Sequence, residues 1–270
     1  MENFVIQIDK SNKFNQIFIP LAQKFLETLK KNKSLNNQKV KIIFGSHANP
    51  EYWIKNTSKN DIIVNLEKIY NEDFRSKNSK YLKLLESNTV IDFCSLNSKF
   101  LNKHYIIKIP PFFVFPQREA ESKIDKKYDV LFVGGTNSER NKILKIIFQK
   151  KFNLVTGFNI FSQKLDLSIK QSKIYLHLNF EKNDIFNHFK FAHSCLYDTV
   201  YYGHSGNLID NPELKELVGL SLFPKDEQII DGLKILINDA ELYEKILLIQ
   251  KKIAKKYDDN FNLFIKDILL

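Results

Sequence analysis

The sequence predicts an α/β protein of two facing Rossmann-like domains with parallel sheets and a long closing helix at the C-terminus. Short apolar runs alternate with amphipathic stretches along the chain, as in folds built from parallel strands and helices. This alternation is interrupted over 110–127, where three prolines and several charges show little periodicity. We therefore expect an N-terminal domain over 1–115, a linker over 116–127 and a C-terminal domain over 128–270.

In the first half, the predicted strands are runs of β-branched and apolar residues that end at Gly, Pro or a polar residue. They cover 5–8, 39–44, 61–66, 89–94 and 104–109. A helix over 13–32 places Ile17, Leu21, Phe25 and Leu29 on one stripe. A second helix is expected over 78–87.

The second half repeats the pattern. Its predicted strands cover 130–133, 152–156, 172–180, 199–202 and 220–223. Its predicted helices begin near 138 and then cover 165–171, 187–196, 226–238 and 240–265. The last helix carries Leu242, Ile246, Ile249, Ile253 and Phe261 near one face, and we expect it to pack back toward the first half.

Composition narrows the class of protein. The chain has 270 residues, 43% hydrophobic content and a formal net charge of +10, which fits a globular protein with anionic partners or a solvated basic surface. The two cysteines are isolated, so a structural zinc site is not expected and a reducing compartment is favoured. No signal peptide or membrane-spanning run is visible, so we expect a cytoplasmic protein.

The segment from Val130 to Phe148 is the most informative part of the chain. An apolar run is followed by Gly134-Gly135, then by polar residues and the start of an amphipathic helix. This order brings backbone N–H groups and a helix N-terminus toward an anion, and Arg140 adds a positive charge. An ordinary strand-to-helix connection is the alternative. Neither GxGxxG nor a Walker loop is present.

Three stretches resemble the GT-B type of bacterial glycosyltransferases, closest to small transferases related to spore-protein and polysaccharide-biosynthesis enzymes. In the first half they are Ile63–Glu67, Tyr81–Leu85 and Val90–Asn97. Asp129–Arg140 is similar to the family's entry into its second domain, and Ser172–Asn179 with Ile185-Phe186 is similar to a later segment. The resemblance covers about residues 60–205.

Four features of this segment depart from the family pattern. Asn187 stands where related sequences carry a glutamate that accepts hydrogen bonds from the donor ribose, and Lys190 replaces an arginine. The usual Asn and His of the strand are His177 and Asn179, and a Ser-Glu pair appears as Gly203-His204-Ser205. Asn187 can still accept from a hydroxyl, but without a charge.

The resemblance implies transfer of a sugar from a nucleotide-diphosphate sugar to a glycan or glycolipid, in cell-surface polysaccharide biosynthesis. No cofactor is expected beyond the donor substrate, and no Asp-x-Asp element indicates a bound metal. Peripheral contact with an anionic membrane at its inner face fits the positive charge, whereas no nucleic-acid-binding signature is present. A decayed GT-B-fold binding or scaffold protein is the alternative.

The candidate donor-binding residues lie in the second half. They are Gly134, Gly135, Thr136, Asn137, Arg140, His177, Asn179, Asn187, Lys190 and Ser205. His177 and Asn179 share one face of their strand by the two-residue period. A solvated lysine and a locally satisfied strand end are the alternatives for Lys190 and for this pair.

The candidate catalytic residues lie in the first half. His47 follows the strand over 39–44, and free imidazole titrates near neutral pH, as a general base requires. Glu67 follows the next strand and would serve as base or orient His47. A surface or capping histidine and a salt-bridged rim glutamate are the alternatives. Tyr52-Trp53 would stack on a sugar or pack in the core.

Overall fold

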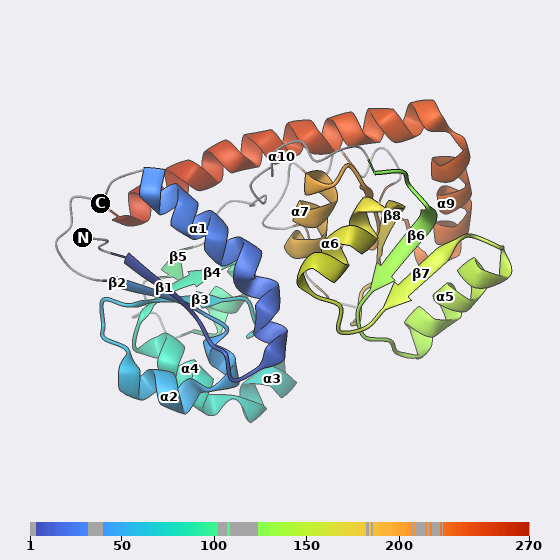
Figure 1. The fold of residues 1–270 in the computed structure, drawn as a ribbon. Coiled ribbons are helices and arrows are strands. Elements are labelled where there is room, and N and C mark those ends of the chain that lie inside the picture. Colours follow the sequence, from blue (N-terminus) through green and yellow to red (C-terminus); the bar gives the residue numbers. More distant parts are fainter. Residues whose placement is uncertain are drawn as a thin grey trace. The chain divides into compact units, whose positions relative to one another are not determined.

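The structure of the protein is a computed structural model with two compact units (Figure 1). It describes residues 4–31, 40–101, 107–108, 124–181, 184, 186–206, 208, 214, 217, 222 and 224–269. Unit 1 comprises residues 1–111 and 260–270, and unit 2 comprises residues 112–259.

Unit 1 is built on a five-stranded parallel sheet in the order β1-β2-β3-β4-β5. Its strands are β1 (Phe4–Ile8), β2 (Val40–Phe44), β3 (Ile62–Asn65), β4 (Thr89–Asp92) and β5 (Ile107–Lys108). The central strands β2, β3 and β4 are largely buried, and most of their residues are Ile, Val or Phe, as in parallel sheets covered on both faces. Their carboxyl ends therefore share one edge of the sheet.

Helices cover both faces of this sheet (Figure 1). On one face, Phe25 of α1 (Ile19–Lys31) packs edge-on against Phe44, and the short helix η1 (Lys13–Phe18) precedes α1. The other face carries α2 (Pro50–Asn56) and α4 (Ser79–Glu86), whose Trp53, Tyr81 and Leu84 join a buried cluster with Ile43 and Ile63. The remaining helices of unit 1 are η2 (Ser46–Ala48), α3 (Glu72–Lys77) and η3 (Ser95–Lys99).

Unit 2 is built on a four-stranded parallel sheet in the order β7-β6-β8-β9. Its strands are β6 (Tyr128–Val133), β7 (Leu154–Gly157), β8 (Ser172–His177) and β9 (Val200–Gly203). One face packs on α6 (Ser162–Lys170) through Leu165 and Ile169, and the other packs on α5 (Ser138–Gln149) through Ile143 and Ile147. The other helices are α7 (His188–Leu196), η5 (Asp226–Gln228) and α9 (Ile229–Asn238).

The last helix, α10 (Ala240–Leu269), contributes to both cores. Ile246, Ile253 and Tyr257 belong to the core of unit 2. Phe261 packs edge-on against Phe25 in unit 1, at 5.2 Å between ring centroids. The expectation that this helix packs back on the first half is confirmed. The last turns therefore group with unit 1, whereas the sequence placed all of 128–270 in one domain.

The parallel sheets and most elements agree with the sequence expectation. Helices α2 and α3 were not predicted, and the expected helix over 13–32 divides into η1 and α1. Most of the expected strand over 220–223 and of the linker over 116–127 lies outside the described residues. Within the described part of the chain, no helix has the length and apolar character needed to cross a membrane.

Candidate functional site

His47 and Glu67 meet at the carboxyl edge of the unit 1 sheet. His47 lies in η2 directly after β2, and Glu67 lies two residues after β3, the neighbouring parallel strand. The His47 Nδ1 atom is 3.2 Å from Glu67 Oε1, and the side chains are 24% and 26% exposed. A neutral imidazole that donates from Nδ1 to the carboxylate keeps the lone pair of Nε2 for a substrate proton. The predicted catalytic pair is thus brought together with one open nitrogen.

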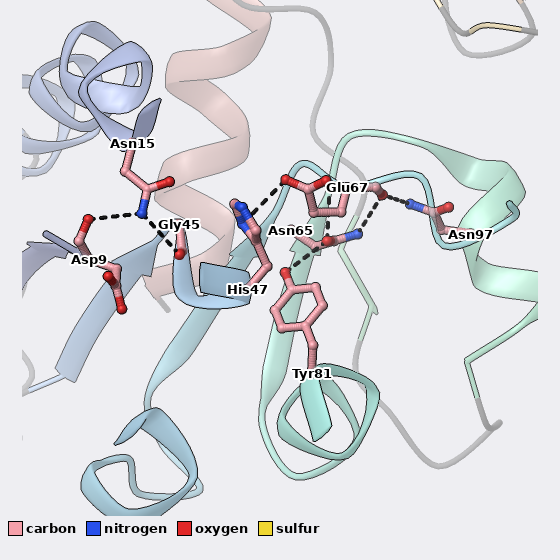
Figure 2. A network of polar contacts seen from close by, with 8 residues as sticks. All are labelled: Asp9, Asn15, Gly45, His47, Asn65, Glu67, Tyr81 and Asn97. Atoms are coloured by element: carbon pink, nitrogen blue, oxygen red, sulfur yellow. Dashed lines mark hydrogen bonds and ion pairs between the residues drawn. The ribbon is translucent and has the colours of Figure 1, made fainter. Parts of the chain in front are cut away.

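Buried amides fix the backbone of Glu67 (Figure 2). Asn97 Nδ2 donates to the Glu67 carbonyl at 2.9 Å, and Asn65 Oδ1 accepts from the Glu67 N–H at 3.1 Å. Both amides are anchored on Asp92, because Asn65 Nδ2 donates to its carboxylate at 2.8 Å and Asn97 Nδ2 at 3.0 Å. Figure 2 shows Glu67 between these amides and His47. The backbone of Glu67 is therefore fixed by these amides, and its carboxylate is oriented by the contact with His47.

Asn65 also binds the phenol of a buried tyrosine. The Tyr81 hydroxyl donates to Asn65 Oδ1 at 2.8 Å, and burial together with the charges of Glu67 and Asp92 raises the pKa of this phenol. The Tyr81 ring lies edge-on to His47 at 6.1 Å between centroids. Tyr81 therefore acts as a neutral donor that packs under the imidazole.

A second polar cluster holds the loop that carries His47. Asn15 Nδ2 donates to the carbonyls of Asp9 at 2.9 Å and Gly45 at 3.2 Å (Figure 2). Gly45 has a φ of 71°, and a Cβ there would lie 2.6 Å from the Asn15 amide, so the turn requires glycine. Trp53 Nε1 donates to Asp9 Oδ2 at 2.5 Å. Trp53 is buried and belongs to the core, whereas its neighbour Tyr52 is exposed.

In unit 2, the predicted Gly-Gly turn follows β6 and enters α5. Gly134 has a φ of 149°, which favours glycine, and its N–H donates to the Gly157 carbonyl at 3.0 Å. Asn137 caps α5 by accepting from the Arg140 N–H at 2.9 Å, and its Nδ2 donates to the Phe180 carbonyl at 2.9 Å. Among the described residues, no group accepts from the N–H of Gly135 or of the exposed Thr136.

The guanidinium of Arg140 ties this turn to the loop after β8. It donates to the carbonyls of Gly135 at 2.5 Å and Asn179 at 3.2 Å, and also to that of Leu178. Arg140 is 8% exposed, and burial lowers its pKa to about 10. Its charge therefore lies beneath the loop, where it adds to the local positive potential and orients three carbonyls. A direct contact with phosphate stays a prediction.

Lys190 in the first turn of α7 supplies a second cation near Arg140. Its Nζ lies 5.1 Å from the ring centroids of both Phe132 and Tyr175. Burial and the charge of Arg140 lower its pKa to about 7. No carboxylate of the described residues pairs with either cation. An anion would therefore be favourable beside Lys190 and would keep the ammonium charged.

His177 ends β8, and Asn179, which was expected on the same strand, lies two residues beyond it; their convergence on one ligand stays a prediction. His177 Nε2 lies 3.1 Å from Asn179 Oδ1, and the Asn179 N–H donates to His204 Nδ1 at 2.9 Å. Burial, followed by the charges of Lys190 and Arg140, holds the pKa of His177 well below its usual range. His204 Nε2 in turn lies 2.6 Å from Asp226 Oδ1. This chain of contacts fixes the edge of the sheet at the ends of β8 and β9.

Two other predicted donor residues have local partners. Asn187 is the N-cap of α7, where its side chain accepts from the Lys190 N–H at 3.0 Å. The hydroxyl of Ser205 donates to the Gly206 carbonyl at 3.0 Å. Both residues lie on the loops beside Lys190 and His204, and a contact with ribose stays a prediction for each.

The sequence reasoning missed some residues of these networks. Asn65 and Asp9 received no role, although each is a polar residue at the end of an apolar strand. Asp226 is separated from His204 by a long stretch of chain, and no spacing rule relates the two. His204 could have been found from its position directly after β9, because His47 also lies shortly after a strand, in the η2 turn that follows β2.

Comparison with known proteins assigns the fold. No family model and no curated protein matches the sequence. Among solved structures, this chain is similar to phage T4 BGT in complex with UDP and Mn²⁺, with a TM-score of 0.61 and 13% identity over 98% of this chain and 99% of that one. It is also similar to a variant of S. aureus TarM in complex with fondaparinux, α-GlcNAc-glycerol and UDP, with a TM-score of 0.59 and 11% identity. That match covers 92% of this chain and 58% of TarM. The fold is of the GT-B type, as the sequence resemblance implied.

Proposed function

We propose that this protein is a glycosyltransferase that moves a sugar from a nucleoside-diphosphate sugar to a hydroxyl of a glycan or glycolipid. The observation that carries the proposal is the His47–Glu67 pair at the carboxyl edge of a parallel sheet, at 3.2 Å. Ligand sites in open α/β sheets lie outside this edge. The GT-B-type fold supports the same activity, because both similar structures described above contain UDP.

Unit 1 supplies the base in this scheme. Glu67 holds the Nδ1–H of His47, so Nε2 accepts the proton of the acceptor hydroxyl as the new glycosidic bond forms. The carboxylate then stabilises the imidazolium. Asn65 and Asn97 keep Glu67 in place throughout, through their bonds to its backbone.

Unit 2 binds the donor diphosphate in this scheme. The open N–H groups of Gly135 and Thr136, the N-terminus of α5 and Lys190 offer donors and positive charge at one sheet edge. As the bond from the anomeric carbon to the phosphate oxygen breaks, the leaving diphosphate gains negative charge. Lys190 and the nearby Arg140 offset that charge.

The proposal includes turnover without a divalent metal. Arg140, Lys190 and the N–H groups at the start of α5 can balance the charge of the leaving diphosphate. Since BGT has been solved with Mn²⁺, the test must compare EDTA-treated protein with protein supplied with Mn²⁺ or Mg²⁺. Metal-independent turnover in EDTA supports this part of the proposal, and its reversible loss contradicts it.

A role in cell-surface polysaccharide biosynthesis at the cytoplasmic side of the membrane completes the proposal. The net charge of +10 would favour an anionic membrane that carries a glycolipid acceptor. Sedimentation with anionic vesicles, compared with neutral vesicles, tests this element separately from catalysis.

One observation favours a second candidate function. Asn187, which replaces the acidic residue expected from the family pattern, already caps α7 with its side-chain oxygen. A chain without a charged ribose ligand would bind a nucleotide or glycan without turning it over. This binding protein would bind the same ligands as the enzyme but would show no turnover.

One experiment separates the two functions. The purified full-length chain is screened by thermal shift against UDP, GDP, CMP and dTDP and their sugars, and nucleotide release is then measured with a glycan or glycolipid acceptor. Stabilisation together with acceptor-dependent release supports the transferase. Stabilisation without release, for wild type and a Glu67→Gln variant alike, supports the binding protein. If neither stabilisation nor nucleotide release is observed, both proposed functions are contradicted.

A further inference from the structure

Two exposed phenylalanine rings lie beside the Gly-Gly turn of unit 2. Phe158 follows β7 and is 66% exposed, and Phe180 lies three residues after β8 and is 48% exposed. A Cβ placed on Gly135 would lie 3.9 Å from the Cε2 atom of each ring. Because β7, β6 and β8 are neighbours in that order, the two rings come from the outer loops and Gly135 from the middle loop.

Hydrogen bonds of the backbone tie both loops that carry these rings to their surroundings. The Phe180 carbonyl accepts from Asn137 Nδ2 at 2.9 Å, and its N–H donates to Asp184 Oδ2 at 2.7 Å. The Arg140 guanidinium lies 4.9 Å from the centroid of the Phe180 ring. The residue before Phe158 accepts from the Gly134 N–H at 3.0 Å, so its loop is tied to the same turn.

The rings remain open on their other sides. Among the described residues, neither Phe158 nor Phe180 packs against a second aromatic ring. Two large apolar side chains are thus kept in water at the edge where ligands of α/β sheets bind. Their exposure costs free energy unless a ligand with an apolar flat face covers them.

We propose that Phe158 and Phe180 bind the nucleobase of the donor nucleotide, with Gly135 as the floor between them. This inference rests on the proposed function. The open N–H groups and Lys190 match the charged diphosphate, and the base is the part of the donor with an aromatic face. Base–aromatic stacking suits such rings, because every base has a π-face.

Gly135 gives the inference a second line of support. Its φ lies outside the left-handed region, so alanine fits its backbone, and the added methyl would make ordinary van der Waals contacts with both rings. Alanine at this position is therefore compatible with folding but occupies the space between the rings. The absence of a side chain here leaves that space for a ligand.

Calorimetry on the full-length chain tests the assignment with two probes. The first is whichever of UDP, GDP and dTDP binds the wild type most tightly, and the second is inorganic pyrophosphate, which has no base. We expect Phe158→Ala and Gly135→Ala to weaken nucleotide binding by about 5- to 100-fold. Pyrophosphate affinity should change less than twofold. Phe158→Tyr should bind the nucleotide like the wild type.

Phe148→Ala is the matched control, because Phe148 is also in unit 2 and is 74% exposed on α5. It should leave both affinities unchanged. Equal nucleotide affinity in wild type, Phe158→Ala and Gly135→Ala overturns the inference and leaves the proposed function standing. If Phe158→Ala loses binding to vesicles that carry a glycolipid but keeps its nucleotide affinity, the inference is also overturned and the rings are assigned to a lipid. A wild type that binds none of the three nucleotides overturns both proposals.

Discussion

Replacement of Glu67 by glutamine isolates the contribution of one negative charge to the proposed catalysis. The amide oxygen can still accept from His47 Nδ1, so the tautomer is kept while the charge is lost. At the observed separation of 3.2 Å, two unit charges interact with about 1.3 kcal/mol at a dielectric constant of 80 and about 5 kcal/mol at 20. Since both side chains are about one quarter exposed, we expect the lower part of this range, about 1–3 kcal/mol.

This energy corresponds to a decrease in kcat of roughly 5- to 150-fold. The assay is nucleotide release from the donor sugar in the presence of acceptor. The affinity for the free nucleotide, measured by calorimetry, should stay within twofold of the wild type. Glu86→Gln, which removes an exposed glutamate from α4 in the same unit, is the control. Wild-type kcat in Glu67→Gln would refute the reasoning that a carboxylate stabilises the imidazolium.

Lys190, Gly203 and Asn97 offer three further tests of the structure. The pKa of Lys190 is about 7 in the folded protein, so nucleotide binding above pH 7 should take up a proton. The nucleotide affinity should then fall by up to about tenfold per pH unit between pH 7 and 9, and Lys190→Met should remove that slope. An unchanged slope in the variant would contradict this prediction. Gly203→Ala should lower the free energy of unfolding by about 1–3 kcal/mol or more, because Gly203 has a φ of 130° and a Cβ there would lie 1.9 Å from the His177 carbonyl oxygen. Urea unfolding measures this change, and an unchanged midpoint would refute the prediction. Asn97→Ala should cost about 1–3 kcal/mol of stability, because it removes the shorter of two hydrogen bonds to the Glu67 carbonyl and leaves only the one from Asn65. It should also lower kcat more than it changes KM, and a change in KM alone would count against this role.

The strand–helix order could be predicted because the sequence pattern is local. The predicted runs 39–44 and 61–66 contain β2 and β3, whose residues 42–44 and 62–65 are buried, and they carry enough Val and Ile to be recognised. The helices that escaped prediction have little apolar signal, since α2 buries only Trp53 and α3 buries no residue. Asn49 and Asn71 set the N-terminal ends of α2 and α3, because their side-chain oxygens accept hydrogen bonds from the first turn of each helix.

The pairing of His47 with Glu67 also follows from the sequence once the sheet order is known. Each residue lies in the loop that follows one of two neighbouring parallel strands, so both reach the same edge. The surroundings of Arg140 do not follow in this way. Its guanidinium binds carbonyls from Leu178 and Asn179, and only the tertiary fold brings that loop to α5. The sequence motif indicated a charge near the turn but not the atoms that the charge contacts.

The central claim is that His47 acts as the base of a glycosyl transfer, and His47→Ala tests it most directly. Single-turnover transfer and nucleotide affinity are measured on the same preparation, with the variant's melting temperature as a check on folding. The account predicts a loss of turnover of about 10²–10⁴-fold with nucleotide affinity within twofold of the wild type. Turnover within a few fold of the wild type, or a loss of nucleotide affinity that accounts for the whole effect, would contradict it.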